Sequence, residues 1–362
     1  MASVTFDSPG FSREKRHLRT LSTRSLPRLS PGLQRALRIV GAVFTAAVLV
    51  EFGFRIVELF DGGSFAASER IAAAKFAPGR EFGGRTVNSL GYWDDEFAAV
   101  PPQTGKLRVA LVGGESTLGG DSRTNFAARI ERIVPGLEID HFGLPELTPA
   151  DWTTQLASDI LPRRPRLVLV CVSADDVVTG PESADWLESR TLRWAGGIFG
   201  GAPARAENRS ALDVDFESFV RRRAPAVAAC RTDDESALAR RWRHSQLALS
   251  RLVHQCRLHD ICVGLVLTPG EYQLAPNLAA SYCRNLGLDP GRIDVDLPQR
   301  RWTAYADKLE VASVDLLPAF RGAGCAVYEP ASVRWTEQGQ TVAAETIGRW
   351  LSGAYAETLA AR

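Results

Sequence analysis

Short apolar runs alternate with segments of helical period along the chain from residue 107 onward. Five of these runs predict strands, and they are LRVALV (107–112), LEIDHF (137–142), RLVLVCV (166–172), CVGLVLT (262–268) and the short SVDLL (313–317). Each run is followed by Gly, Pro or Ser, which are residue types that end strands and form turns. Buried strands that alternate with helices predict an α/β fold, in which helices cover a parallel sheet.

Two segments have the apolar spacing of sheet-covering helices, residues 236–258 and 341–351. Between the third and fourth strands, residues 178–235 show no sustained periodicity and contain the run GGIFGG, which indicates an insertion. Loops beyond the carboxyl ends of strands surround the ligand crevice of an α/β sheet. The insertion is therefore interpreted either as a lid or as a plain surface excursion.

The N-terminal region divides into three parts. Residues 1–38 are rich in Arg, Ser and Pro, which predicts a disordered basic tail. An uninterrupted apolar run follows at 39–50, and its extension to residue 60 reaches the length of a bilayer span. We interpret 39–60 as a transmembrane signal anchor, with a cleaved signal peptide and a soluble core helix as alternatives. Residues 61–106 form a linker and lead-in segment before the predicted domain at 107–355.

The charge pattern bears on location and partners. The basic flank before the apolar run predicts a single-pass protein of the cell membrane, with a cytoplasmic N-terminus and an extracytoplasmic domain. The 362 residues are 45% hydrophobic and 23% charged, proportions that argue against a polytopic membrane protein. A net charge of +1 gives no indication of a nucleic-acid partner.

Cysteine usage does not settle the compartment. The six cysteines allow several disulfide pairings, and their spacing fits no zinc framework. Cys171 lies inside an apolar run, where a buried free thiol is the expected state. We expect no metal and no cofactor.

The sharpest local feature is LRVALVGGESTLGGD (107–121), a buried strand followed by glycines, an acid and a serine. This pattern places Ser116 at a strand-to-loop transition, where the backbone can approach a ligand closely. A phosphate-binding loop is excluded because the glycines and hydroxyl residues do not have the required spacing. A glycine-rich turn with an incidental serine remains the structural alternative.

In these residues the chain resembles the SGNH (GDSL-type) hydrolases, whose first block is a strand followed by Gly-Asp-Ser. Further segments are similar to the later blocks of that family and to the segment that often precedes its first strand, over about residues 85–352: VNSLGYWDDEF (87–97), HFGLPELTPADW (141–152), PRLVLVCVSADDV (165–177), CVGLVLTPGEY (262–272) and YEPASVRWTEQGQTVAAETIGRWL (328–351). The resemblance implies a flavodoxin-like three-layer α/β/α sandwich, Ser116 as nucleophile and Gly143 as an oxyanion-hole glycine.

The same resemblance exposes departures from the catalytic pattern. Arg334 stands at the position of the catalytic His, and a guanidinium cannot accept a proton at neutral pH. The acid that precedes this His falls on Ser332 or Ala331. Asp175 stands at the position of the oxyanion-hole Asn, where an ionised carboxylate opposes a developing oxyanion. The neighbouring Asp176 matches the family's Asp.

Two alternatives stay open at the site. Aligning on Thr117 and Gly119 places Glu115 at the nucleophile position, but we prefer the alignment that keeps Gly-acid-Ser and Ser116. His141, beside the oxyanion glycine, is a candidate substitute base or else a structural residue.

These residues predict an SGNH hydrolase-like protein that acts weakly or not at all on an ester-linked acyl group of an envelope glycan or lipid. The alternative is a catalytically silent SGNH-fold module that binds an envelope glycan, lipid or protein. A nucleotide-binding α/β module is disfavoured because no phosphate-loop spacing is present.

Overall fold

The computed structural model describes residues 30–61, 65–82, 85–98, 106–121, 123–178, 216–233 and 236–356. The chain divides into two compact units, Met1–Val50 and Glu51–Arg362, which are described separately.

The first unit contains most of helix α1 (Pro31–Asp61). Its segment Pro31–Gly53 has a mean hydropathy of 1.8 with none of it buried, so it is long and apolar enough to cross a membrane. A signal sequence near an N-terminus meets the same criterion. The helix begins at Pro31, inside the predicted tail, and the remaining tail residues 1–29 lie outside the described part of the chain.

The second unit is built on a five-stranded parallel sheet with the order β4-β3-β5-β6-β7. The strands are β3 (Leu107–Val112), β4 (Leu137–His141), β5 (Leu167–Val172), β6 (Cys262–Leu267) and β7 (Ala312–Asp315). Counted along the chain this order is 2-1-3-4-5, the flavodoxin-like doubly wound arrangement. The predicted fold class is confirmed, and each predicted strand is present within about two residues of its expected limits.

Alternate residues of the central strands enter two separate cores, one on each face of the sheet. Ala110, Val112 and Val170 belong to one core, and Val109, Leu111 and Leu169 belong to the other. Because both faces are covered, the strands β5 and β6 are continuous apolar runs and do not alternate with polar residues.

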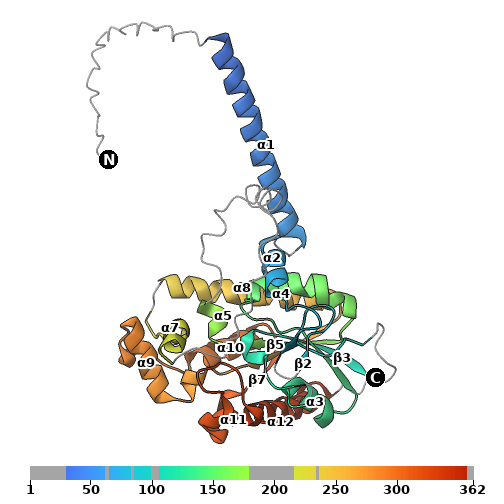
Figure 1. Cartoon of the computed structure of the whole chain (residues 1–362), viewed down its shortest axis with the longest axis vertical. Helices are drawn as coiled ribbons and strands as arrows, with labels where there is room; N and C mark the ends of the chain where they lie inside the picture. The colour runs from blue at the N-terminus through green and yellow to red at the C-terminus, as the bar shows by residue number, and fades with distance from the viewer. Residues whose placement is uncertain are drawn as a thin grey trace, which may run out of the picture. The chain divides into compact units, whose positions relative to one another are not determined.

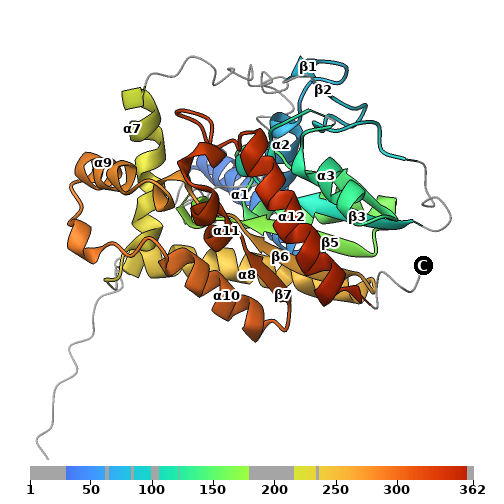
Figure 2. The same ribbon diagram turned by 90° about the horizontal axis from the view of Figure 1, so that it is seen from below.

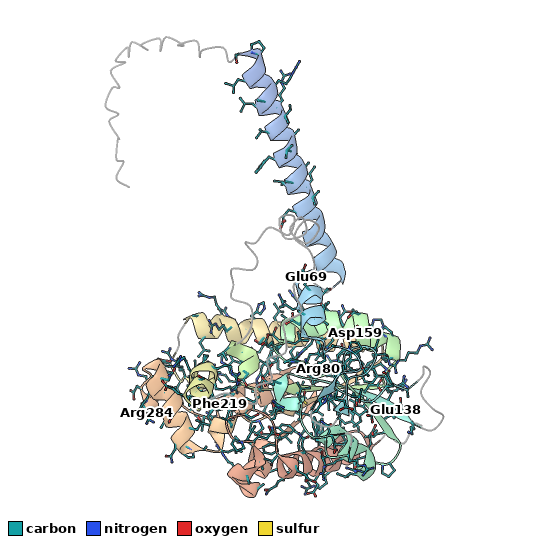
Figure 3. The ribbon with its side chains drawn as sticks, in the orientation of Figure 1. Glu69, Arg80, Glu138, Asp159, Phe219 and Arg284 are labelled. Atoms are coloured by element: carbon teal, nitrogen blue, oxygen red, sulfur yellow. The ribbon has the colours of Figure 1, made fainter. Side chains whose placement is uncertain are left out.

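The first core is covered by the helices α2 (Phe65–Ala74), α4 (Pro149–Gln155), α7 (Phe216–Val227), α8 (Ser236–Leu258), α9 (Pro276–Leu286) and α10 (Leu297–Lys308). The second core is covered by α3 (Phe126–Ile133), α11 (Leu317–Ala323) and α12 (Glu337–Ala354). Figures 1 and 2 show the two helical layers on either side of the strands. Phe219 and Arg284, from α7 and α9, lie toward one end of this unit, and Glu138, from the edge strand β4, lies toward the other (Figure 3).

The lead-in segment before β3 is folded against the edge of the sheet. The Asn88 side chain accepts hydrogen bonds from the backbone N–H groups of Leu90 and Tyr92, which closes a compact turn. Asp94 Oδ2 accepts the backbone N–H of His141 at 2.8 Å, so the segment contacts β4 directly. A small antiparallel ribbon of β1 (Glu81–Phe82) and β2 (Arg85–Thr86) precedes it.

The predicted insertion at 178–235 is described only in part. Residues 179–215 lie outside the described residues, so neither the lid nor the surface interpretation is tested there. Its last part forms α7 and a short 3₁₀ turn (Ala228–Cys230), and α7 packs against α9 in the first core.

Candidate active site

The strand order places one topological switch point in the sheet. The chain leaves β3 for β4 on one side and enters β5 on the other, so the loops after β3 and β5 diverge. In open α/β sheets ligands bind in the crevice at the carboxyl ends of the strands that flank such a point. We therefore expect the candidate functional residues in the loops that follow these two strands, at 113–117 and 173–176.

Ser116 lies in a 3₁₀ turn, Glu115–Thr117, directly after β3. Its side chain is half-buried, whereas Thr117 is fully buried. Thr117 Oγ1 donates to the carbonyl of Gly114 at 2.8 Å, and the Thr117 backbone N–H donates to the same carbonyl at 3.1 Å. These bonds fix the turn that presents Ser116 at the edge of the sheet.

Gly143 follows β4 and lies against the same turn. The backbone N–H of Leu144 donates to the carbonyl of Gly113 at 3.1 Å, which ties the two loops together. A methyl group added at Gly143 would fall on Thr117 Oγ1, and one added at Gly113 would lie 2.5 Å from Thr117 Cγ2. Thr117 thus fills the space that the two glycines leave, which explains why both positions lack a side chain.

His141, the last residue of β4, is completely buried. Its ring makes an edge-to-face contact with Phe126 of α3, with the centroids 6.2 Å apart. A methyl group at Gly143 would lie 2.8 Å from His141 Cε1 and 2.9 Å from His141 Nε2. The imidazole therefore lies beneath Gly143 and beside Thr117, on the face of the sheet that α3 covers.

Arg334 lies in the loop that precedes α12, and this loop packs on the turn after β3. A Cβ atom at Gly119 would lie 3.9 Å from Arg334 Cβ and 3.5 Å from the carbonyl oxygen of Trp335. The side chain of Ser332 accepts the backbone N–H of Arg334 at 3.0 Å. The last block is therefore next to the first block.

Asp175 begins α5 (Asp175–Val178), directly after β5. Its Oδ2 accepts from Arg223 Nη2 at 2.7 Å, and Arg223 also binds both carboxylate oxygens of Glu271, at 3.0 and 3.1 Å. Tyr282 adds a hydrogen bond to Glu271 at 2.7 Å. We call these four residues the Arg223 cluster: Asp175, Arg223, Glu271 and Tyr282. The cluster joins α7, α9 and the carboxyl ends of β5 and β6.

The Arg223 cluster has a defined charge distribution. Burial raises the pKa of Asp175 above its ordinary value, although the nearby Arg223 acts in the opposite direction. Burial also acts to raise the pKa of Glu271, but the charge and hydrogen bonds of Arg223 outweigh it and the pKa is lowered. Arg223 therefore favours the charged form of Glu271, to which it makes two hydrogen bonds, more than that of Asp175, to which it makes one. The charge of Asp175 is directed at a guanidinium, which reduces the conflict that its position predicted.

The adjacent Asp176 has a capping role. Its Oδ2 accepts the backbone N–H of Ser173 at 2.6 Å and the Ser173 hydroxyl at 3.1 Å, which closes the first turn of α5. Burial raises the pKa of Asp176 to about 7. Its carboxylate is thus engaged with the backbone that holds Asp175 in place.

Tyr328 connects the last block to the Arg223 cluster. Its hydroxyl donates to the carbonyl of Pro269, in the turn between β6 and Glu271. Burial raises the pKa of Tyr328, and the negative charge of Glu271 adds to this effect. The loops after β3, β4, β5 and β6 and the loop before α12 therefore meet at one edge of the sheet.

Sequence reasoning missed Arg223, Glu271 and Thr117. Glu271 stood in the quoted segment after β6 without an assigned role, and Arg223 lies in the insertion, within a run of three arginines. The run itself gave no indication of which arginine is buried. Cys171 is a buried free thiol, as expected, and burial raises its pKa. Within the described residues, no group of His, Cys, Asp and Glu side chains is arranged to hold a metal ion.

No protein-family model matches the sequence, and no curated protein matches it. Among solved structures, the chain is similar to a protein assigned to the lipolytic G-D-S-L family from Desulfitobacterium hafniense DCB-2, with 13% identity and a TM-score of 0.40 over 68% of this chain and 100% of that one.

It is also similar to a lipase/acylhydrolase from Enterococcus faecalis (12% identity, TM-score 0.39, 68% of this chain and 96% of that one). A third similar structure is an acetylxylan esterase from Geobacillus stearothermophilus in a catalytic mutant form (12% identity, TM-score 0.38, 69% of this chain and 96% of that one). The likeness is one of fold, which the strand order establishes independently, and it carries no activity or residue role to this chain.

Proposed function

We propose that this protein is an SGNH hydrolase-like acyl-ester hydrolase of low activity, with Ser116 as its nucleophile and Gly143 in its oxyanion hole. The substrate class is an ester-linked acyl group on an envelope glycan or lipid. The domain lies outside the cytoplasm and is held at the membrane by the apolar N-terminal helix. An active-site serine on a fold of this kind works by acyl transfer through a covalent intermediate.

One observation carries the proposal: Ser116 occupies a 3₁₀ turn at the switch point of the sheet, and its neighbour Thr117 contacts Gly143 in the loop after β4. Nucleophilic attack and oxyanion stabilisation require a hydroxyl and a backbone donor on neighbouring loops, and the turn of Ser116 and the loop of Gly143 are neighbours of this kind.

The low rate follows from the missing base. Arg334 stays protonated and cannot take the serine proton. His141 is buried beneath Gly143, which favours a structural role in supporting that loop. Loss of one member of a catalytic triad leaves a residual rate of roughly 10³–10⁴ over the uncatalysed reaction, supplied by the oxyanion hole and binding.

Hydrolysis of 4-nitrophenyl acetate by the purified full-length chain in detergent tests the proposal. We expect slow, saturable turnover that Ser116→Ala abolishes and that Ser352→Ala, an exposed serine on α12, leaves unchanged. Glu115→Gln should retain turnover, because the preferred alignment gives Glu115 no nucleophilic role. Turnover that persists in Ser116→Ala would remove Ser116 as the nucleophile.

A second function is favoured by one feature, the arginine beside the Gly119 turn. A guanidinium at the position of a general base suits binding of an anionic group better than proton transfer. A catalytically silent module that binds an envelope glycan, lipid or protein would show no covalent labelling of Ser116 by a fluorophosphonate probe. Labelling of wild-type protein that is absent in Ser116→Ala supports the hydrolase instead.

A further inference from the structure

Helix α8 presents a basic stripe to solvent. Its buried side faces the first core, and the opposite side carries one continuous row at helical spacing: Arg240, Arg243, His244, Leu247, Arg251, His254 and Leu258. All seven are exposed, and Leu247 and Leu258 have 51% and 63% of their surface accessible. The sequence of α8 contains no Asp or Glu, so its own residues do not neutralise this row. We call this row the α8 stripe.

A shallow depression extends the α8 stripe toward α10. It has a volume of about 500 Å³ and lies between the two helices, with Arg243 on one side and Arg301 and Tyr305 on the other. The guanidinium of Arg301 stacks over the ring of Trp242, 5.1 Å from the ring centroid. Two arginines and two aromatic side chains thus border a surface hollow, and this combination suits a phosphate-bearing headgroup.

The layer that contains α8 is also the layer that the chain enters first. Helix α2 packs against α4, and α4 packs against α8, so these three helices cover the same face of the sheet. Figure 1 shows α8 and α4 along the same side of the sheet. Only a short stretch of chain separates α2 from the segment that is apolar enough to span a membrane. The domain is therefore kept within reach of a lipid surface.

We propose that the α8 stripe docks on a bilayer surface that contains anionic phospholipid. The arginines pair with lipid phosphates, and Leu247 and Leu258 insert between the headgroups. Basic residues next to a membrane contribute to binding additively, and exposed leucines add apolar contact at the interface. An acidic polymer such as a nucleic acid would pair with the arginines but offers no place for two leucines.

The test uses the full-length chain in nanodiscs, so that the apolar helix is in lipid in every sample. A fluorophore is attached through Leu247→Cys, or through Ile133→Cys on α3 as a matched control, in a background with Cys262→Ser and Cys325→Ser; the other four cysteines are buried. Ile133 is 43% exposed and belongs to the opposite helical layer. Quenching by headgroup-proximal spin-labelled lipid is compared between pure phosphatidylcholine and phosphatidylcholine with about 30% phosphatidylglycerol.

We expect strong quenching at position 247 with the anionic lipid, weak quenching without it, and weak quenching at position 133 in both. Reversing three charges, Arg240→Glu, Arg243→Glu and Arg251→Glu, should lower the docking equilibrium constant by at least roughly a hundredfold, because the loss of each arginine alone costs about fivefold and the new carboxylates repel the anionic lipid. The matching Arg→Lys triple variant should dock, because the charge is retained. Arg132→Glu with Arg349→Glu, on the opposite layer, should dock like the parent.

Three results would overturn the proposal. The first is quenching at position 247 that does not depend on anionic lipid. The second is quenching that survives the triple Arg→Glu variant while its circular dichroism shows a folded protein. The third is binding of a nucleic acid or another polyanion through the same arginines without lipid-dependent quenching, which would assign the α8 stripe to a polymer.

Discussion

Replacing Arg223 by methionine isolates the energetic role of the Arg223 cluster. Methionine keeps most of the volume of the side-chain stem but removes the guanidinium from two carboxyl groups. The Glu271 side chain is 5% exposed, the Arg223 side chain 14% and that of Asp175 25%, so Glu271 is the group left without solvent. Removing one partner of a buried ion pair costs about 3–5 kcal/mol, because the other charge remains uncompensated. This is a large share of a typical unfolding free energy of about 5–15 kcal/mol.

The assay is urea unfolding followed by tryptophan fluorescence at pH 7, in one detergent for all variants. The control is Arg221→Met, two residues earlier on α7, whose partner Glu217 is as exposed as Arg221 itself. A surface pair of this kind contributes at most about 1 kcal/mol, so the control should unfold close to wild type. The contrast between two arginines of one helix separates burial from a general effect of charge on α7.

Two further measurements check the mechanism. Adding Glu271→Gln to Arg223→Met removes the stranded charge and keeps an acceptor for Tyr282, so it should recover part of the loss, roughly 1–3 kcal/mol. The difference in unfolding free energy between wild type and Arg223→Met should also become smaller as pH falls from 7 to 4. In wild type, the lowered pKa of Glu271 gives stability that is present above its unfolded pKa and is lost as pH falls. Without Arg223 the buried carboxyl has a raised pKa, which favours the folded state at low pH. A loss below about 1 kcal/mol at pH 7, or a further loss on adding Glu271→Gln, would refute this account.

Other parts of the site give three more predictions. Burial raises the folded-state pKa of Asp176 to about 7, so the stability that this carboxyl contributes is present below its unfolded pKa and is lost as pH rises through 7. The free energy of unfolding of Asp176→Asn, measured relative to wild type, should therefore increase between pH 4 and 7. An equal difference from wild type at both pH values would contradict this. Gly143→Ala should lower the free energy of unfolding by about 1–3 kcal/mol, because the new methyl group overlaps Thr117 Oγ1. Thermal unfolding of the double variant should show that Thr117→Ala reduces this loss. Strictly additive effects of the two substitutions would mean that the overlap is relieved elsewhere. The double variant Ser332→Asp, Arg334→His introduces the His-Asp pair that the resemblance implies. The rate of ester hydrolysis should rise roughly a hundredfold, and it should increase with pH through the pKa of the new imidazole. An unchanged rate in a folded variant would mean that residue 334 does not reach Ser116.

The central strands were predictable because each is a mostly apolar run with a clear end. LRVALV and RLVLVCV are buried on both faces, so nothing in them competes with the strand prediction. Helix α8 was predicted with its observed limits, since its buried side is apolar over many turns. Helices α9 and α10 were missed because their apolar stripes are short and interrupted by polar residues that are half-buried in the fold.

The composition of the site was less predictable. Ser116 and Gly143 follow strands directly, so strand positions alone bring them to one edge of the sheet. Arg223 reaches Asp175 and Glu271 across 48 residues of chain in each direction, and it comes from a segment without hydrophobic periodicity. The sequence pattern does not indicate which of the three arginines at 221–223 binds the two carboxyl groups. Only the packing of α7 against α9 makes the choice.

The departures from the catalytic pattern are connected by charge. Asp175 brings a carboxyl group to a position where an amide is expected, and Arg223 balances it within the buried cluster. Arg334 then brings a cation to the position of the base, in a loop tied to the same cluster through Tyr328 and Pro269. Compared with the pattern that the resemblance implies, the chain keeps a serine and a glycine, but it has an acid in place of an amide and a cation in place of a base. These departures alter the charge of the candidate site more than its shape. We therefore expect the proposed activity of Ser116 to depend on the charges around it, and the variants at 223 and 334 test those charges separately from the fold.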